Sequence, residues 1–531
     1  MRKKALGIDL GTTNSAMAMV KDNKAQIIPI GANDESVLRS AIYFSNISGK
    51  NRVSIGLDAI NRGTKVGKIE YFKHDFKRDI AKSVESEAPN HVRVNSVILS
   101  ALILNEFKKR AEIVARELGQ DDLKNVVITV PAYFTSDQRK ATKDAGKIAG
   151  FNVLRIINEP TAAAISYAHE KNISGNVLVY DLGGGTFDVT IMHVADHHYD
   201  ILATDGNHRL GGLDFDKRLV NLIKQKLENQ GLNMTSLTPK EEIQLRYQAE
   251  KIKIALSVHQ STYYEHFSDN GDFEVEITQK DFALAIQDLV KDTQLKIEST
   301  LLESKLRWED IDHILLVGGS TRMPIVRQMI ESISGKMPHY EINPDTIVAE
   351  GASIIADLIV NDQVSFREQQ NGLDTNDSKV VVRDVTSQGI GMLFRKVPGR
   401  QYDFVGDFVN SVLVPRNTQI PVTVTKDLYA FVDGQPNFQL KLTEGNYANP
   451  INVQQILKRV VYLATPRQKG EKLASVHLTF DEEQMIHISI FDSLTNTLLD
   501  EFEINAQSNT EKQVVEDDLE ELKAILNQFV L

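Results

Sequence analysis

The sequence predicts an α/β region built from two similar halves, followed by a β-rich region and a short terminal helix. Three observations carry this prediction. A strand–acid–glycine motif occurs twice, strands alternate with helices up to about residue 360, and short strands of alternating polarity follow. Alternating strands and helices are typical of α/β domains, whereas successive short strands are typical of sandwiches and barrels. With 531 residues, the chain is long enough for two or more domains.

The later copy of the motif, NVLVYDLGGGTFDVTIMHV at residues 176–194, is the stretch around which the α/β region is organised. An apolar strand ends at Asp181, and the turn before the next apolar stretch contains Gly183, Gly184, Gly185 and Thr186. Glycines let a backbone approach a ligand closely and point N–H groups at phosphate oxygens. An acid at the strand end can hold a magnesium ion through oxygen or water. Alone, such a turn is more often a plain hairpin.

An earlier copy of the motif, ALGIDLGTTNSAMAMV at residues 5–20, favours a phosphate-binding turn over a plain hairpin. Its strand ends at Asp9, and its turn contains Gly11, Thr12, Thr13 and Asn14. Two copies far apart in sequence imply two similar half-domains that face one another. A nucleotide between them would have its phosphates held from both sides, and each side would bring one acid to the metal.

Apolar periodicity predicts the other elements. We expect strands at 26–30, 40–44, 126–130, 153–157 and 311–317, and helices at 95–118, 136–149, 158–170, 219–230, 241–256, 281–306 and 345–359. Residues 361–378 are polar and without period, which indicates a linker. Alternation predicts strands at 438–442 and 486–490, and an apolar stripe predicts a helix from about residue 507.

Composition narrows the function classes. The net charge of −12 argues against a nucleic-acid surface as the main site. The absence of cysteine excludes disulfides, thiolate zinc sites and a cysteine nucleophile. No stretch is apolar enough to span a bilayer, so we expect no membrane partner and take a cytoplasmic location as the default. Zinc-like spacing occurs at His193, His197 and His198, but on a predicted strand and hairpin these side chains do not converge.

Together the motifs GIDLGTTNS, VPAYF, RIINEPTAAA, VYDLGGGTFDVT, LLVGGSTRMP, INPDTIVAEGA, RDVT and PRNTQIP resemble, in the same order, the heat-shock protein seventy (DnaK-type) chaperone family. The resemblance covers nearly the whole chain up to the last helix. It implies an actin-like ATPase domain at 1–361, with two similar half-domains around a nucleotide cleft, and an interdomain linker at 362–383. It also implies a β-sandwich substrate-binding domain at 384–507 and a short helix at 508–531, a vestigial lid. The implied function is an ATP-dependent chaperone that binds and releases unfolded or extended polypeptide under control of ATP hydrolysis.

The resemblance also assigns chemistry to individual residues. It implies a magnesium-dependent ATPase whose catalytic residues are Asp9, Lys77, Glu159, Asp181 and Thr186. Asp9 and Asp181 would hold Mg²⁺ mostly through water, with Asp188 beside the bound cations and K⁺ as a further candidate. Lys77 would touch the γ-phosphate, but Lys73 is a rival because this loop departs from the family's spacing. These groups suit phosphoryl transfer to water, which needs positioning and charge neutralisation and no covalent intermediate.

The remaining assignments concern ATP or ADP itself. Both motif turns, Gly11–Asn14 and Gly183–Thr186, would line the phosphates. The resemblance implies further contacts from Gly211, Gly212, Glu250, Lys253, Ser257, Gly318, Gly319, Ser320, Arg322 and Asp345.

Partners follow from two more residue sets. In the family, a set of residues transmits the nucleotide state of the ATPase domain to the second domain. These positions are matched here by Pro131, Arg139 and Glu159. Pro131 and Arg139 also have local structural explanations. Positions that meet a J-domain co-chaperone are matched by Arg155, Asn158 and Thr161. The expected partners are therefore extended polypeptides, a J-domain co-chaperone and a nucleotide-exchange factor.

The chain also departs from the family pattern. Ile254 stands where the family has arginine, and Leu213 where it has an acid, which suggests weaker or altered nucleotide affinity. Arg383 and Ser387 change the linker, so its docking is expected to be weaker. In place of a long helical lid there is one short helix, so a trapped peptide should escape quickly.

The resemblance also implies a peptide pocket in the β-domain. Its candidate residues are Met392, Leu428, Phe431, Phe438 and Leu440. The large side chain of Phe438 would fill a small pocket. The alternative is that all five residues belong to the apolar core of the sandwich. This supports a second hypothesis, a nucleotide-gated scaffold or regulatory protein that holds a dedicated partner through its β-domain. A small-molecule kinase or filament former on the same fold is a third, disfavoured by the β-domain.

Overall fold

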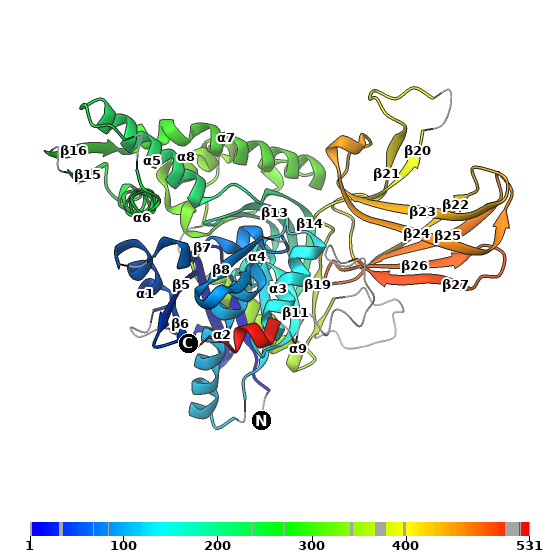
Figure 1. The fold of residues 1–531 in the computed structure, drawn as a ribbon, viewed down its shortest axis with the longest axis horizontal. Coiled ribbons are helices and arrows are strands. Elements are labelled where there is room, and N and C mark those ends of the chain that lie inside the picture. Colours follow the sequence, from blue (N-terminus) through cyan, green and yellow to red (C-terminus); the bar gives the residue numbers. More distant parts are fainter. Residues whose placement is uncertain are drawn as a thin grey trace.

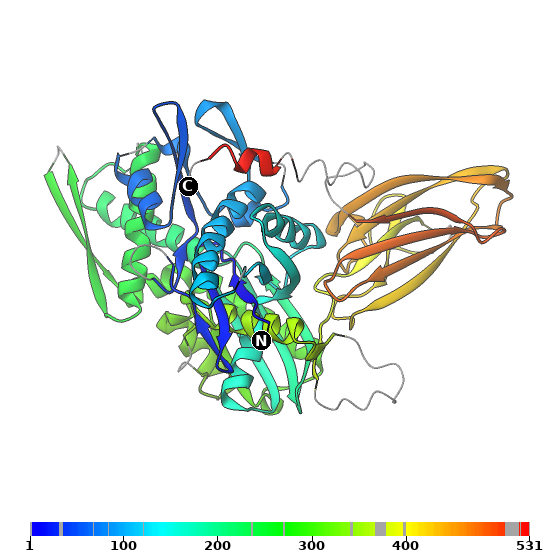
Figure 2. The same cartoon turned by 90° about the horizontal axis from the view of Figure 1, so that it is seen from below.

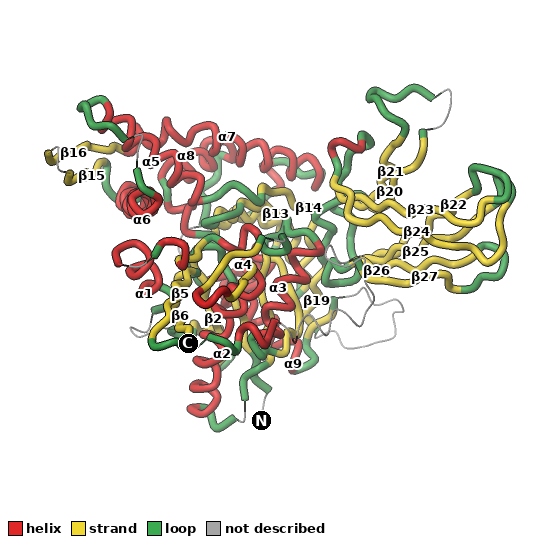
Figure 3. The backbone as a smooth tube through the Cα atoms, viewed as in Figure 1, coloured by secondary structure: helices red, strands yellow, loops and turns green. Residues whose placement is uncertain are grey.

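The computed structural model describes residues 3–30, 35–66, 68–82, 84–120, 122–234, 237–268, 271–339, 343–366, 379–396, 400–504, 520 and 522–529. Helices and strands mix up to residue 366, whereas the described residues between 384 and 504 form strands apart from one short 3-10 helix, Pro450–Asn452 (Figures 1 and 3). Across these ranges, no helix combines the length and the apolar character needed to cross a bilayer.

The first large sheet has the earlier motif at its centre. Its strands run in the order β11, β10, β1, β2 and β3, and β4 also pairs with β2. β1 is parallel to β10 and antiparallel to β2, so the motif turn lies at the carboxyl end of β1. The strands are β1 (Leu6–Asp9), β2 (Asn14–Lys21), β3 (Lys24–Ile27), β4 (Leu38–Arg39), β10 (Asn125–Val130) and β11 (Asn152–Asn158).

The second large sheet repeats this arrangement around the later motif. Its strands run in the order β17, β12, β13, β14, β19 and β18. β12 is parallel to β17 and antiparallel to β13, just as β1 is to β10 and β2. The strands are β12 (Gly175–Leu182), β13 (Phe187–Ala195), β14 (His198–Asn207), β17 (His313–Val317), β18 (Val364–Ser365) and β19 (Val380–Arg383).

Helices cover the two sheets and lie between them (Figures 1 and 2). They are α1 (Leu57–Asn61), α2 (Ser96–Glu117), α3 (Ser136–Ile148), α4 (Glu159–Lys171), α5 (Gly212–Glu228), α6 (Pro239–Leu256), α7 (Gln279–Ser304), α8 (Pro324–Ser334) and α9 (Ile347–Val360). α4 and α9 share one apolar core with both sheets. They touch at Gly351, where a Cβ would lie 1.8 Å from the carbonyl oxygen of Ala162. A glycine at this point lets the two halves approach closely.

The helices and strands expected in this region are present, with ends shifted by a few residues and with α5 beginning at Gly212 instead of residue 219. The elements that the patterns missed include α1, α8 and the hairpin of β15 (Ser261–Ser268) and β16 (Gly271–Thr278). In the hairpin, side chains such as Tyr263 and Phe267 are exposed although apolar, so its sequence does not separate an inner from an outer face.

Smaller sheets complete the first half. β6 (Lys50–Ile55), β5 (Ala41–Ile47) and β7 (Phe72–His74) form a three-stranded sheet, and β8 (Glu85–Ala88) pairs with β9 (Val92–Asn95). A 3-10 helix, Phe76–Asp79, follows β7 almost directly. This short segment carries Lys77 toward the centre of the molecule.

The C-terminal part consists of two four-stranded antiparallel sheets around a common apolar core. One has the order β21, β20, β23 and β24, and the other β22, β25, β26 and β27. The expected alternation is confirmed in β26, whose residues are buried at every second position. The strands are β20 (Ile390–Arg395), β21 (Phe408–Val414), β22 (Val422–Tyr429), β23 (Gln435–Glu444), β24 (Gln454–Arg467), β25 (Lys472–Phe480), β26 (Ile486–Asp492) and β27 (Leu498–Glu503). We call this unit the sandwich.

The sandwich is docked on the α/β part. β19 joins the second sheet as a parallel neighbour of β14. Ser136 Oγ donates to the carbonyl oxygen of Gln484 at 3.1 Å, which ties the sandwich to the first half. The backbone N–H of Thr204 donates to Asn417 Oδ1 at 2.9 Å, which ties it to the second. The helix expected at 508–531 lies largely outside the described residues, of which 520 and 522–526 are helical.

Candidate nucleotide site

The two motif turns face each other and touch. A Cβ on Gly184 would lie 2.0 Å from Thr13 Oγ1, and one on Gly185 would lie 2.5 Å from Thr12 Oγ1. Any larger residue would push the turns apart, so the glycines set how closely the halves approach. The carboxyl ends of β1 and β12 therefore meet at one point, as the repeated motif predicts.

Below the turns lies a buried ion pair. Lys77 Nζ donates to Glu159 Oε1 at 2.9 Å, and both side chains are almost completely buried. The ammonium group also lies 5.3 Å from the centre of the Phe134 ring. The rival Lys73 donates instead to the carbonyl oxygen of Glu70, on its own segment. The geometry thus brings Lys77, and not Lys73, to the glutamate.

Three further carboxylates lie close to this pair. Burial, with repulsion from Glu159, raises the pKa of Asp9 to about 7. The same two causes raise the pKa of Asp188 to about 8 and that of Asp181 well above its ordinary value. Thr129 Oγ1 donates to Asp9 Oδ1 at 3.0 Å. Four buried carboxylates around one ammonium group leave an excess of negative charge that a cation would relieve.

The residues fit a magnesium–nucleotide complex. Asp188 Oδ2 and Thr13 Oγ1 are buried without a hydrogen-bond partner among the described residues. In that same part of the chain, no three His, Cys, Asp or Glu side chains converge on one point. A hard cation held mostly through water and phosphate oxygens agrees with both observations.

The turns and the ion pair open into a cavity of about 1230 Å³ between the halves. A narrower inner space of about 80 Å³ is lined by both turns and by Asp9, Lys77, Glu159, Asp181, Gly318 and Asp345. The outer cavity is lined by the other predicted nucleotide contacts, namely Gly212, Glu250, Lys253, Ser257, Gly319, Ser320 and Arg322. Two predicted residues stand behind these walls: Gly211 backs Gly184, and Asp188 pairs with Asp181 across β12 and β13.

Comparison with known proteins decides the family. The chain matches the family model described as Hsp70 protein over residues 62–528. It is 36% identical over 504 residues to the chaperone protein DnaK of Thermosipho melanesiensis, covering 92% of this chain and 78% of the relative. It is likewise 36% identical over 500 residues to the chaperone protein DnaK of Thermotoga maritima, with the same coverage. The chain belongs to the Hsp70 family.

A chloroplast relative widens the range of organisms. Heat shock 70 kDa protein 6, chloroplastic, of Arabidopsis thaliana is 32% identical over 467 residues, covering 84% of this chain and 61% of the relative. The predicted family is confirmed, and with it the predicted ATPase activity and ATP-dependent chaperone function. Hsp70 proteins bind ATP or ADP with Mg²⁺, which agrees with the charge of the cleft floor.

Sequence reasoning missed an ion pair that bridges the cleft mouth of this Hsp70 chain. Both terminal nitrogens of Arg39 donate to the carboxylate of Glu250 at 2.8 Å, and Arg39 also donates to Asn14 Oδ1 at 3.2 Å. Arg39 belongs to the first half and Glu250 to α6 of the second. The two residues are 211 positions apart, so no local pattern could have paired them.

One wall of the outer cleft is apolar. Ile254 and Val258 lie one turn apart on and just after α6, and they are 59% and 79% exposed. Both line the cavity, as does Arg322, which pairs with Asp345 at 2.7 Å. At the position where the resemblance implies an arginine, the wall of the outer cavity is therefore a bare hydrocarbon surface.

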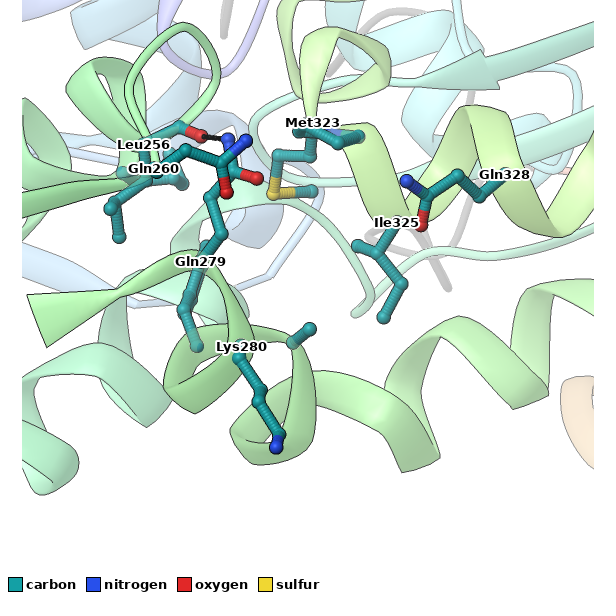
Figure 4. A pocket seen from close by; sticks show the side chains of 11 residues that line it. Leu256, Gln260, Gln279, Lys280, Met323, Ile325 and Gln328 are labelled. Carbon is teal, nitrogen blue, oxygen red and sulfur yellow. Dashed lines mark hydrogen bonds between the residues drawn. The ribbon is translucent and has the colours of Figure 1, made fainter.

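A smaller cavity of about 240 Å³ adjoins this wall (Figure 4). Its lining combines Leu256, Met323 and Ile325 with the carboxamides of Gln260, Gln279 and Gln328. Gln279 Nε2 donates to the carbonyl oxygen of Leu256 at 2.7 Å. Met323, Pro324, Gln328 and Lys253 line both cavities, so this space is a side chamber of the nucleotide cleft.

One predicted relay residue, Arg139, is linked to the C-terminal part through a single intermediary. Arg139 donates to Asn158 Oδ1 at 2.5 Å, and Asn158 Nδ2 donates to Asp384 Oδ2 at 2.7 Å. Asp384 begins the C-terminal part, and Asn158 precedes Glu159 in the chain. Burial lowers the pKa of Arg139 to about 10, which still leaves it charged at neutral pH. Hydrogen bonds thus connect Arg139 to the start of the C-terminal part through Asn158, the neighbour of Glu159 in the chain.

The three predicted J-domain positions lie in different environments. Thr161 and Asn158 are buried. Arg155 is partly exposed, with its guanidinium group 3.4 Å from the centre of the Phe366 ring. It also donates to the carbonyl oxygen of Glu482 at 2.6 Å. Of the three, Arg155 is the side chain that a partner protein could reach.

The five predicted peptide-pocket residues separate into two groups. In the core that the two sandwich sheets share lie Met392, Leu428, Phe438 and Leu440, each at most 9% exposed. Phe431 is 57% exposed, and the Arg395 guanidinium lies 5.3 Å from its ring centre. The four buried residues therefore lie where the alternative interpretation, a plain sandwich core, expects them. Phe431 lies outside that core.

Proposed function

We propose that this Hsp70-family chain hydrolyses ATP in the cleft described above and uses the cycle to bind and release extended polypeptide. Residues 1–361 would form an actin-like ATPase domain of two half-domains, 362–383 the linker, 384–507 the peptide-binding sandwich and 508–531 a terminal helix. The observation that carries the proposal is the buried Lys77–Glu159 pair beneath two touching glycine turns. These are groups that phosphoryl transfer to water requires.

Each residue has a distinct proposed role. The backbone N–H groups of both turns and the Lys77 ammonium group bind the phosphates. Glu159, held by Lys77, and Asp181 orient the attacking water, and Thr186 supports the turn beside it. Bound Mg²⁺ would neutralise phosphate charge, with Asp9 and Asp181 as its protein partners and Asp188 beside a further cation such as K⁺.

The docked sandwich is proposed to be one of two states. β19 in the second sheet and the Arg139–Asn158–Asp384 chain link nucleotide state to sandwich position. ATP would favour the docked, low-affinity arrangement, and hydrolysis would release the sandwich to grip peptide. A J-domain partner would act at Arg155 after displacing Phe366, a nucleotide-exchange factor would complete the cycle, and the protein would work in the cytoplasm.

The catalytic proposal is tested by a matched pair of lysine variants. Lys77→Met should lower single-turnover ATP hydrolysis by about 10²–10³-fold, because it removes a charge aimed at the transferred phosphate. Lys73→Met removes the same charge from the rival position and should change the rate less than about threefold. Equal effects of both substitutions would contradict the assignment.

The chaperone proposal is tested by release of a labelled extended apolar peptide. Fast release on addition of ATP, absent in Thr186→Ala, is the expected result. The positions of Phe438 and Phe431 keep the scaffold hypothesis open as a second candidate. No peptide binding in either nucleotide state, with ATP still bound, would reject client binding and favour a nucleotide-gated scaffold.

A further inference from the structure

Two histidines lie side by side at the amino end of β17, the end of this strand that points away from the nucleotide cleft. His313 begins the strand, which runs to Val317, just before Gly318 of the cleft lining. His339 follows α8 and pairs with β17 as a parallel bridge to Leu315. The Nδ1 atom of His313 and the Nε2 atom of His339 are 3.3 Å apart.

The backbone holds both histidines in place. The N–H of His339 donates to the carbonyl oxygen of Ile314 at 2.8 Å, and His313 pairs with Val177 of β12. Residues two apart on a strand point to the same face, and so do residues that are paired across two strands. His313 therefore shares a face with Leu315, and His339, the bridge partner of Leu315, shares it too. The sheet itself thus aims both imidazoles to one side.

The ring of Tyr167, on α4, covers part of the histidine pair. Its centre lies 5.2 Å from that of the His339 ring and 6.3 Å from that of the His313 ring. Tyr167 is buried, whereas both histidines are partly exposed. The pair is therefore backed by an aromatic ring and can still be reached by a small ion from solvent.

The surroundings of His313 favour its neutral form. Burial, followed by repulsion from His339, lowers the pKa of His313 below its ordinary value of 6.5. The ring of His313 also donates a hydrogen bond to the backbone of Ser174. A histidine that binds a metal is neutral and donates its second ring N–H to a carboxylate, a backbone carbonyl or water. His313 meets both conditions.

The separation of the two nitrogen atoms is that of two ligands on one metal ion. Bonds from Zn²⁺ to histidine nitrogen are about 2.0–2.1 Å long, and a tetrahedral angle between two of them places the nitrogens about 3.3–3.4 Å apart. The nitrogen atoms of His313 and His339 lie within this range. A plain hydrogen bond between the rings is also compatible with the distance, and the two cases differ in whether the pair takes up a metal.

We propose that His313 and His339 form a binding site for a divalent transition-metal ion such as Zn²⁺, separate from the Mg²⁺–nucleotide site. Within the described part of the chain no third His, Cys, Asp or Glu joins them, so water completes the coordination. Imidazole suits Zn²⁺, whereas Mg²⁺ prefers oxygen ligands, so the two sites select different ions. Structural zinc sites have four protein ligands, and a site with two holds an exchangeable ion.

The site is tested by Zn²⁺ titration of the full-length chain against a chromogenic chelator. Saturating Mg²⁺ and ADP keep the carboxylates of the nucleotide cleft occupied throughout. His313→Asn and His339→Asn should each weaken one Zn²⁺ site by at least about 100-fold, because even the loss of an outer partner of a metal ligand costs about 10–100-fold.

His197→Asn is the matched control. This exposed histidine belongs to the group with zinc-like spacing in the sequence, and its loss should leave the site unchanged. Equal Zn²⁺ binding by the unaltered chain and all three variants would show a hydrogen-bonded pair only and overturn the proposal. A loss confined to His197→Asn would overturn it as well.

A second measurement needs no substitution and is therefore independent of misfolding. Zn²⁺ should slow hydrogen exchange of the unaltered chain in β17 and at His339, because the ion joins these two segments. Mg²⁺ at the same concentration should not. Protection by Zn²⁺ that is absent from β17 and His339 would overturn the site.

Discussion

The nucleotide cleft and the predicted peptide pocket illustrate two kinds of site. In the cleft, polar and charged side chains from distant segments converge on an open space of about 1230 Å³. In the sandwich, four of five predicted pocket residues lie in a common apolar core, and Phe431 stands outside it.

The difference lies in what burial costs each kind of side chain. Burying a carboxylate or an ammonium group costs folding free energy, so a buried cluster of such groups indicates a bound ligand or a reaction. Apolar residues gain stability in a core and in a pocket alike. A polar site can therefore be recognised from its residue types, whereas an apolar pocket needs its geometry as well.

The largest expected effect tests the cleft floor. Glu159→Gln keeps the shape of the side chain but removes the charge that orients water and pairs with Lys77. Single-turnover hydrolysis should fall by at least about 100-fold, the range of general base contributions, while ATP affinity changes little. Glu112→Gln, on the exposed face of α2, is the matched control. A loss of less than about tenfold would show that Glu159 has a structural role and not a catalytic one.

The next effect tests the sandwich side of the comparison. Phe438→Val should lower the free energy of unfolding by about 2–4 kcal/mol, because it removes a large side chain from a packed core. Phe431→Val, at an exposed position, should cost less than about 0.5 kcal/mol. Denaturant unfolding measures both. Tighter binding of an extended peptide to the Phe438 variant would instead support the pocket.

A smaller effect concerns the mouth of the cleft. Ile254→Arg should tighten ATP binding by about two- to fivefold, since a guanidinium group stacked on a base contributes roughly 0.5–1 kcal/mol. Titration calorimetry at constant ionic strength measures the change. Val258→Arg adds the same charge one turn further on as a control. Equal gains in both variants would reveal general attraction of the nucleotide and not stacking.

The smallest effect is a pH dependence beside Gln484, the sandwich residue that contacts Ser136 of the first half. His487 Nε2 lies 3.0 Å from Asp481 Oδ2, and this hydrogen bond raises the pKa of His487 above 6.5. The charged imidazole therefore adds stability below about pH 6.5, and this is lost as the pH rises through the raised pKa. His487→Asn should cost about 0.2–0.5 kcal/mol at about pH 5.5 and nothing at about pH 8.5, because the pair is partly exposed. A cost independent of pH would refute the pair.

The sequence predicted what depends on local pattern and on repetition. Both motif turns, their acids and most helices of the α/β part were accessible because each is encoded within about 20 residues. The choice between Lys73 and Lys77 was not, because it depends on how the 3-10 helix after β7 is aimed. The Arg39–Glu250 pair and the Phe366–Arg155 stack join residues more than 200 positions apart, and tertiary packing alone brings each pair together.

Strand β19 has a consequence for aggregation. While it is paired, the row of backbone groups along β14 from His198 to Asp200 is covered. Releasing the linker would expose that row as a sheet edge, and unpaired edges are templates for strands of other chains. The outermost strand, β18, is two residues long and is followed in the sequence by a polar stretch. The edge of the docked sheet therefore offers few backbone groups to another strand. Each time the sandwich undocks, the exposed edge of β14 would be able to pair with a strand of a second copy of the chain.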